Sequence, residues 1–110
     1  MKIDFTYLET ISDGDHEFIK EFLSTFEETY IALNKKMSDE FTSRDFVNLG
    51  KTAHQLKPSV KMLGLECAED LENFQNNPET ATIEQLNFIK DNCQKGFSEL
   101  KIWAKEKGVE

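Results

Sequence analysis

The sequence predicts an all-α protein, an antiparallel four-helix bundle with a short extra helix at the N-terminus. Apolar residues recur at steps of three and four along most of the 110 residues, which is the spacing of one buried face of a helix. The polar stretches between these stripes are short, and short connections favour antiparallel neighbours. No strand-like alternation or internal repeat occurs. We therefore expect a single domain covering residues 1–110.

The first two predicted helices are separated by the turn signal Ser-Asp-Gly at residues 12–14. A short helix covers residues 5–11, and Ser12 or Asp13 then caps a longer helix. Polar residues 38–44 are expected to form the next turn. The long helix has a clear apolar stripe, made of Phe18, Ile19, Phe22, Leu23, Phe26, Tyr30, Leu33 and Met37.

The third predicted helix contains a proline in the middle of its apolar stripe. Thr42 or Ser43 is expected to cap this helix. Pro58 lacks the N–H group that would bond to the His54 carbonyl, so it could also begin a new helix. Because the stripe keeps its phase on both sides of Pro58, we expect one kinked helix. The stripe consists of Phe46, Leu49, Ala53, Leu56, Val60 and Leu63.

Two further helices complete the predicted fold. Gly64, in a left-handed conformation, separates the third helix from a shorter one that ends within residues 75–78. Thr80 or Thr82 begins the last helix, and the tail from Lys105 onward is expected to fray. The apolar residues of the two helices are Leu65, Ala68, Leu71 and Phe74, and then Ile83, Leu86, Ile89, Cys93, Phe97, Leu100 and Ala104, with Trp103 closing one end of the core.

Composition excludes several classes of function. The formal net charge of -8 argues against nonspecific nucleic-acid binding, which needs a basic surface. No apolar run is long enough for a signal peptide or a membrane span. Cys67 and Cys93 form no CxxC pair and are expected to be reduced, packed as small apolar residues, with no metal site. We expect a cytoplasmic monomer that binds neither nucleic acid nor membrane.

The one segment that suggests a chemistry surrounds His54. At about 100° per residue, His54 points about 130° away from the centre of the apolar stripe. We therefore expect an exposed imidazole with Gly50 beside it on the solvent-facing side. Residues within about 60° of His54 on the helix are Val47, Gly50, Lys51, Lys57, Pro58 and Lys61.

An exposed histidine on a helix is most often an ordinary surface residue, and we interpret His16 in that way. His54 differs because Gly50 and Pro58, both unfavourable inside a helix, lie on either side of it. Neutral imidazole is a good nucleophile, and nearby lysines favour the neutral ring and attract an anionic group. No Asp, Glu or Ser in the segment is placed as a catalytic partner, so a group carrier fits better than a complete enzyme.

Two segments carry a family resemblance. The first reads Ala53-His54-x-Leu56-Lys57-x-Ser59, followed by Leu63-Gly64. The second, upstream, reads Gly14-Asp15-x-Glu17-Phe18, then Phe22-Leu23 and Phe26. Together they resemble the histidine-containing phosphotransfer (HPt) domains, from about Asp4 into the fourth helix of the bundle, and the resemblance supports this bundle topology. Many members of that family have Gly at the position of Pro58.

The resemblance implies a phosphorelay carrier. His54 would accept a phosphoryl group from the aspartyl phosphate of a receiver domain and pass it to another receiver, with Lys57 stabilising the phosphoryl oxygens. The chain would need no cofactor, and Mg²⁺ is expected on the partner. The expected partners are response-regulator receiver domains and a hybrid histidine kinase. Docking contacts are expected from Val47, Gly50, Lys51, Gln55, Pro58 and Lys61.

Two alternatives stay open. A helical interaction module could dock receiver domains through the same face without phosphotransfer. A stand-alone hydrolase could use His54 as a base, but this is a poor fit because no nucleophile or oriented carboxylate accompanies the ring.

Overall fold

The computed structural model describes residue 3 and residues 5–109, and most of these residues are helical, with no strand among them. The predicted all-α class is confirmed. None of the described helices is both long and apolar enough to span a membrane. The helices are α1 (Thr6–Ser12), α2 (His16–Thr42), α3 (Phe46–Met62), α4 (Ala68–Asn76) and α5 (Ile83–Glu106), with a short 3-10 helix, η1 (Pro78–Thr80), between the last two.

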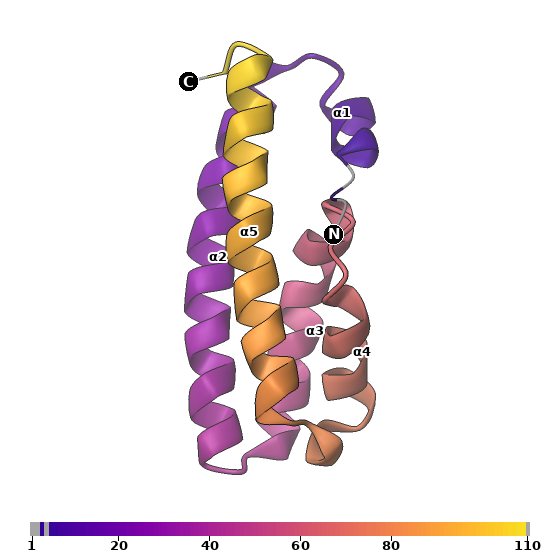
Figure 1. Cartoon of the computed structure of the whole chain (residues 1–110), viewed down its shortest axis with the longest axis vertical. Coiled ribbons are helices and arrows are strands. Elements are labelled where there is room, and N and C mark those ends of the chain that lie inside the picture. Colours follow the sequence, from indigo (N-terminus) through magenta and orange to yellow (C-terminus); the bar gives the residue numbers. More distant parts are fainter. Residues whose placement is uncertain (1–2, 4, 110) are drawn as a thin grey trace.

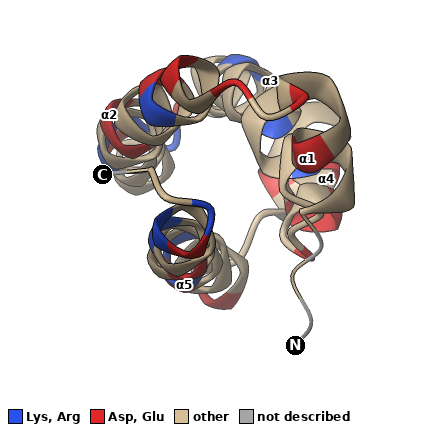
Figure 2. Ribbon diagram, turned by 90° about the horizontal axis from the view of Figure 1, so that it is seen from above, with Lys and Arg blue, Asp and Glu red and all other residues tan. Residues whose placement is uncertain are grey.

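The helices α2, α3, α4 and α5 lie side by side, and each runs in the opposite direction to the helix before it (Figure 1). α3 packs against both α2 and α4, and α5 packs against α2 and, more lightly, α4. Viewed from above, they surround a common centre (Figure 2). The largest fully buried side chains fill this centre and include Phe26, Met37, Leu49, Leu56, Phe74, Ile89 and Leu100.

The predicted turn over residues 38–44 is wrong, because α2 continues to Thr42. Tertiary contacts explain the extra helical turn. The Glu40 side chain is buried against α3, where Thr52 Oγ1 donates a hydrogen bond to Glu40 Oε2 at 3.0 Å. Phe41 packs against the core. A polar stretch therefore stays helical where one charged side chain finds a buried partner on the next helix.

The caps of α2 and α3 lie two or three residues after the predicted ones. Asp15 caps α2 by accepting hydrogen bonds from the backbone N–H groups of Glu17 and Phe18, at 3.0 and 3.2 Å. Asp45 caps α3 in the same way. Asp13 instead ends α1, in a left-handed conformation with φ of 45°. The mistaken candidates were Ser12 or Asp13 for α2 and Thr42 or Ser43 for α3.

Three predictions for the middle of the chain are confirmed, while the kink expected at Pro58 stays a prediction. α3 runs through Pro58 as one helix. Gly64 has a left-handed φ of 65°, and the next residue, Leu65, donates its backbone N–H to the Val60 carbonyl at 3.2 Å. Thr82 begins α5 with a capping box, in which its hydroxyl and backbone N–H both pair with the residue three positions later.

The expectation that the C-terminal tail frays is wrong for the residues described. α5 continues to Glu106, and Val109 is buried against Ile19 of α2. The backbone N–H of Val109 donates to the Ala104 carbonyl at 2.9 Å. Glu110, which the same expectation covered, lies outside the described residues. A single apolar residue after a glycine therefore anchors the tail in a small cluster with Ile19 and Ala104.

Candidate functional site

The local sequence of α3 fixes the direction in which His54 points. Asp45 sets the start of the helix, and Leu49, Ala53 and Leu56 are fully buried on its inner face. His54 lies on the opposite side and is exposed, as the sequence predicts. Within residues 3 and 5–109, neither ring nitrogen is engaged in a hydrogen bond or ion pair. The imidazole is therefore a free nucleophile or base.

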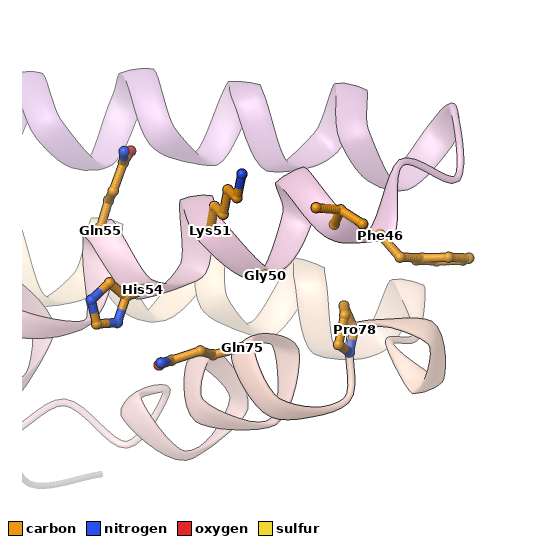
Figure 3. Close-up of a pocket in the computed structure, with 8 residues that line it drawn as sticks. Phe46, Gly50, Lys51, His54, Gln55, Gln75 and Pro78 are labelled. Carbon is orange, nitrogen blue, oxygen red and sulfur yellow. The ribbon is translucent and has the colours of Figure 1, made fainter.

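His54 borders an open depression between α3 and the C-terminal end of α4 (Figure 3). The side chain of Gln75 extends from α4 toward His54, while Lys51 and Gln55 point to the side nearer α2 (Figure 3). Val47 is 69% exposed and gives the depression an apolar edge. The complete lining is Phe46, Val47, Gly50, Lys51, His54, Gln55, Gln75 and Pro78.

The structure brings together five of the eight predicted site residues in this depression. Pro58 and Lys61 are also exposed but line a neighbouring depression, together with Tyr7 of α1. Lys57 lines neither one. The predicted face is thus divided along α3, with one part next to α4 and the other next to α1.

The Lys57 side chain lies against α4 rather than extending into solvent. It is only 16% exposed and reaches α4, where Nζ donates to Gln75 Oε1 at 2.9 Å. The carboxylate of Glu72 lies 3.9 Å from the same nitrogen. The ammonium is therefore held against α4, because α4 offers both an amide oxygen and a carboxylate there.

The expectation that Gly50 faces solvent is wrong. Gly50 is buried, and a Cβ added to it would lie 3.3 Å from the Phe74 carbonyl oxygen and 3.4 Å from that of Gln75. The helical wheel cannot detect this contact, because it depends on where α4 lies. Gly50 lets α3 approach the end of α4 and forms the floor of the depression.

The charge around His54 contrasts with that of the whole chain. α3 contains three lysines and no acidic residue, although the formal net charge of the protein is -8. Lys51 and Lys61 are exposed and stay free of ion pairs with any described residue. A surface with an excess of positive charge attracts anionic groups.

Sequence reasoning missed the contribution of α4 and η1. Gln75 and Pro78 line the depression, and Glu72 approaches Lys57. In the sequence, residues 75–78 read as the polar end of a helix followed by a proline, which is an ordinary termination signal. No local pattern marks Glu72 or Gln75 as partners of a lysine that precedes them by 15 and 18 residues.

The buried cysteines lie elsewhere. Cys67 and Cys93 are both fully buried free thiols. A hydrogen bond with Cys93 and burial raise the pKa of the Cys67 thiol, so it stays protonated. In the described part of the chain, no group of three or more His, Cys, Asp or Glu side chains is arranged to hold a metal ion.

The site offers an exposed imidazole, an ammonium held against α4 and an exposed apolar side chain, that of Val47. No carboxylate among the described residues bonds to the His54 ring, as the orienting group of a catalytic triad would. Comparisons of the chain with protein-family models, with curated proteins and with solved structures gave no match. The function must therefore be inferred from the residues themselves.

Proposed function

We propose that this chain is a histidine phosphotransfer protein of a phosphorelay. His54 would accept a phosphoryl group from the aspartyl phosphate of one receiver domain and deliver it to the aspartate of another. In this proposal α2 to α5 form the antiparallel four-helix bundle of such a carrier, and α1 is the extra N-terminal helix. The chain would act as a cytoplasmic monomer, with receiver domains and a hybrid histidine kinase as its partners.

One observation carries the proposal: an exposed, unbonded imidazole shares its helix with an ammonium that is already held in place. Lys57 follows His54 by three residues, and Gln75 holds its Nζ at 2.9 Å. A transferred phosphoryl group is strongly anionic, so a fixed positive charge beside the acceptor stabilises it at little cost in reorganisation. The sequence signature around His54 supports the same chemistry.

The transfer step balances without any further reactant. The lone pair of the unprotonated ring nitrogen attacks phosphorus, and the N–P bond forms as the O–P bond of the acyl phosphate breaks. The bonding electrons leave with the aspartate carboxylate of the receiver. The other ring nitrogen then releases its proton to water. The Mg²⁺ needed for the phosphoryl chemistry would belong to the receiver, so this chain needs no cofactor of its own.

Docking without transfer is the second candidate, and the apolar edge of the depression favours it as much as it favours the carrier. Val47 is 69% exposed, and Phe46 and Pro78 lie beside it in the lining. Exposed apolar side chains next to a charged site are typical of a protein-binding surface. Both candidates predict binding to receiver domains, and only the carrier predicts label on His54.

Transfer of labelled phosphate from a panel of phosphorylated receiver domains tests the proposal. Wild-type protein should become labelled, and His54→Gln should lose the label completely, because glutamine has no nucleophilic ring nitrogen. His16→Gln is the matched control and should label normally, since His16 lies at the start of α2. The label should be acid-labile and alkali-stable, as a phosphoramidate is.

Labelling of His54→Gln at the wild-type level would contradict the proposal. Binding of receivers without any labelling of the wild-type chain would favour the docking module instead. Thermal unfolding of both variants serves as the control for folding.

A further inference from the structure

The ammonium of Lys57 is shared between two side chains of α4 that differ in charge. Gln75 Oε1 accepts a hydrogen bond from Lys57 Nζ at 2.9 Å, and Glu72 Oε1 lies 3.9 Å from the same nitrogen. Glu72 and Gln75 are three residues apart on α4, so they share one face of that helix. The Lys57 side chain is 16% exposed, whereas that of Glu72 is 56% exposed.

The two partners respond differently to a phosphoryl group on His54. Gln75 is neutral and can keep its hydrogen bond while Lys57 also contacts an anion, because an ammonium has three donors. Glu72 is negatively charged, and its carboxylate oxygen lies 3.9 Å from the same ammonium nitrogen. Once His54 carries a phosphoryl group, two anionic groups compete for one ammonium, so the contact of Glu72 with Lys57 weakens the contact that the phosphoryl group can make with it and raises the free energy of the phosphorylated state.

We propose that Glu72 competes with the phosphoryl group on His54 for the Lys57 ammonium and thereby keeps the phosphohistidine labile toward onward transfer. Gln75 acts as a positioning residue that keeps Lys57 at the site in both states. This inference rests on the proposed function, and it adds a residue of α4 that sets the position of the phosphoryl equilibrium.

Glu72→Gln removes the charge and keeps the size of the side chain. The equilibrium between receiver acyl phosphate and phospho-His54 should shift toward His54 by about two- to five-fold, which is the range that a partly exposed ion pair supports. Quantification of labelled receiver and labelled carrier at equilibrium measures this shift. Glu99→Gln, an equal change of charge at an exposed position on α5, is the matched control and should leave the equilibrium unchanged.

A double-mutant cycle with Lys57→Gln separates competition for Lys57 from a general effect of charge. If Glu72 acts through Lys57, Glu72→Gln should no longer shift the equilibrium once Lys57 has been replaced. An unchanged equilibrium in the single variant, or an equal shift in the Lys57→Gln background, would overturn the inference while wild-type transfer proceeds normally. Failure of every receiver to label the wild-type chain would instead overturn the proposed function, and the inference with it.

Discussion

Gly50 brings the backbone of α3 close to the last turn of α4. A Cβ at this position would lie 3.3 Å and 3.4 Å from two backbone carbonyl oxygens, those of Phe74 and Gln75. Backbone atoms at a helix end cannot move aside as a flexible side chain can. The same residue lines the depression beside His54, so the glycine allows α3 to approach the end of α4, where Gln75 accepts a hydrogen bond from Lys57.

Gly50→Gln should therefore destabilise the protein by about 1–3 kcal/mol, the usual cost of forcing extra atoms into a packed contact. The gain of about 1 kcal/mol from replacing a helical glycine is too small to offset it. Urea unfolding measures the change, with Val47→Gln as the control. Val47 lines the same depression but is 69% exposed, so that variant should change stability by less than about 0.5 kcal/mol. Equal stability of Gly50→Gln and wild type would show that the α3–α4 contact is loose.

At the scale of elements, local patterns predict the helices well and their ends poorly. The in-phase stripe correctly predicted a single α3 through Pro58, and Gly64 marked the turn after it. The end of α2 could not be predicted, because it depends on the buried bond between Thr52 and Glu40 on different helices. Tertiary contacts of this kind override local propensity.

The same limit applies to the candidate site. Helical periodicity predicted the exposure of His54, Lys51 and Lys61, because side-chain direction within one helix follows from spacing alone. It failed for Gly50 and could not show that Lys57 reaches α4, since both contacts depend on the position of α4. A site within one helix can be predicted from its sequence, whereas a site between two helices needs the packing.

Pro58 gives a prediction at the scale of α3. An interior proline leaves the His54 carbonyl without its helical N–H partner and strains the preceding turn. Pro58→Ala supplies that N–H, and Pro58 is exposed, so no core packing is lost. The variant should be more stable by about 1–3 kcal/mol in urea unfolding. Lower stability would mean that the packing of α3 against α4 depends on a bend at Pro58, and receiver-to-His54 transfer would then be expected to fall as well.

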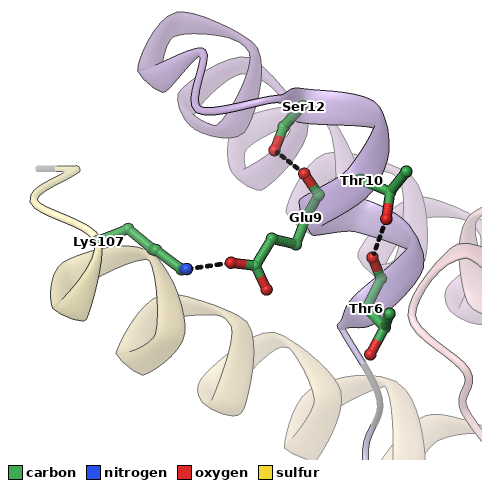
Figure 4. A network of polar contacts seen from close by, with 5 residues as sticks. All are labelled: Thr6, Glu9, Thr10, Ser12 and Lys107. Carbon is green, nitrogen blue, oxygen red and sulfur yellow. Dashed lines mark hydrogen bonds and ion pairs between the residues drawn. The ribbon is translucent and has the colours of Figure 1, made fainter.

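At the scale of the whole molecule, α1 and the C-terminal residues cover the end where the long helices extend past the short ones. α2 and α5 have 27 and 24 residues, against 17 and 9 for α3 and α4. α1 occupies the space above α3 and α4 (Figure 1). Its Glu9 forms an ion pair with Lys107 beyond the end of α5 (Figure 4). The ring centroids of Phe5, directly before α1, and Trp103 of α5 lie 5.5 Å apart.

Replacement of Leu8 tests whether the seven-residue helix α1 unfolds together with the core. The Leu8 side chain is fully buried in the main cluster, so Leu8→Ala should lower the free energy of unfolding by about 2–4 kcal/mol. Tyr7→Ala is the control on the same helix, since Tyr7 is 59% exposed and should cost less than about 1 kcal/mol. Glu9→Gln should also cost less than about 1 kcal/mol, because the ion pair with Lys107 lies at the surface.

Urea unfolding followed by circular dichroism and by Trp103 fluorescence measures all three variants. The two signals should report one transition in each, because Trp103 contacts both Phe5, the residue directly before α1, and the core. Two outcomes would contradict the cooperative unfolding of α1 with the core. One is a loss of stability in Leu8→Ala no larger than that in Tyr7→Ala, and the other is a fluorescence change that precedes the loss of helix. α1 would then detach before the remaining helices unfold, and the depression next to Tyr7, Pro58 and Lys61 would not persist as a surface for a partner.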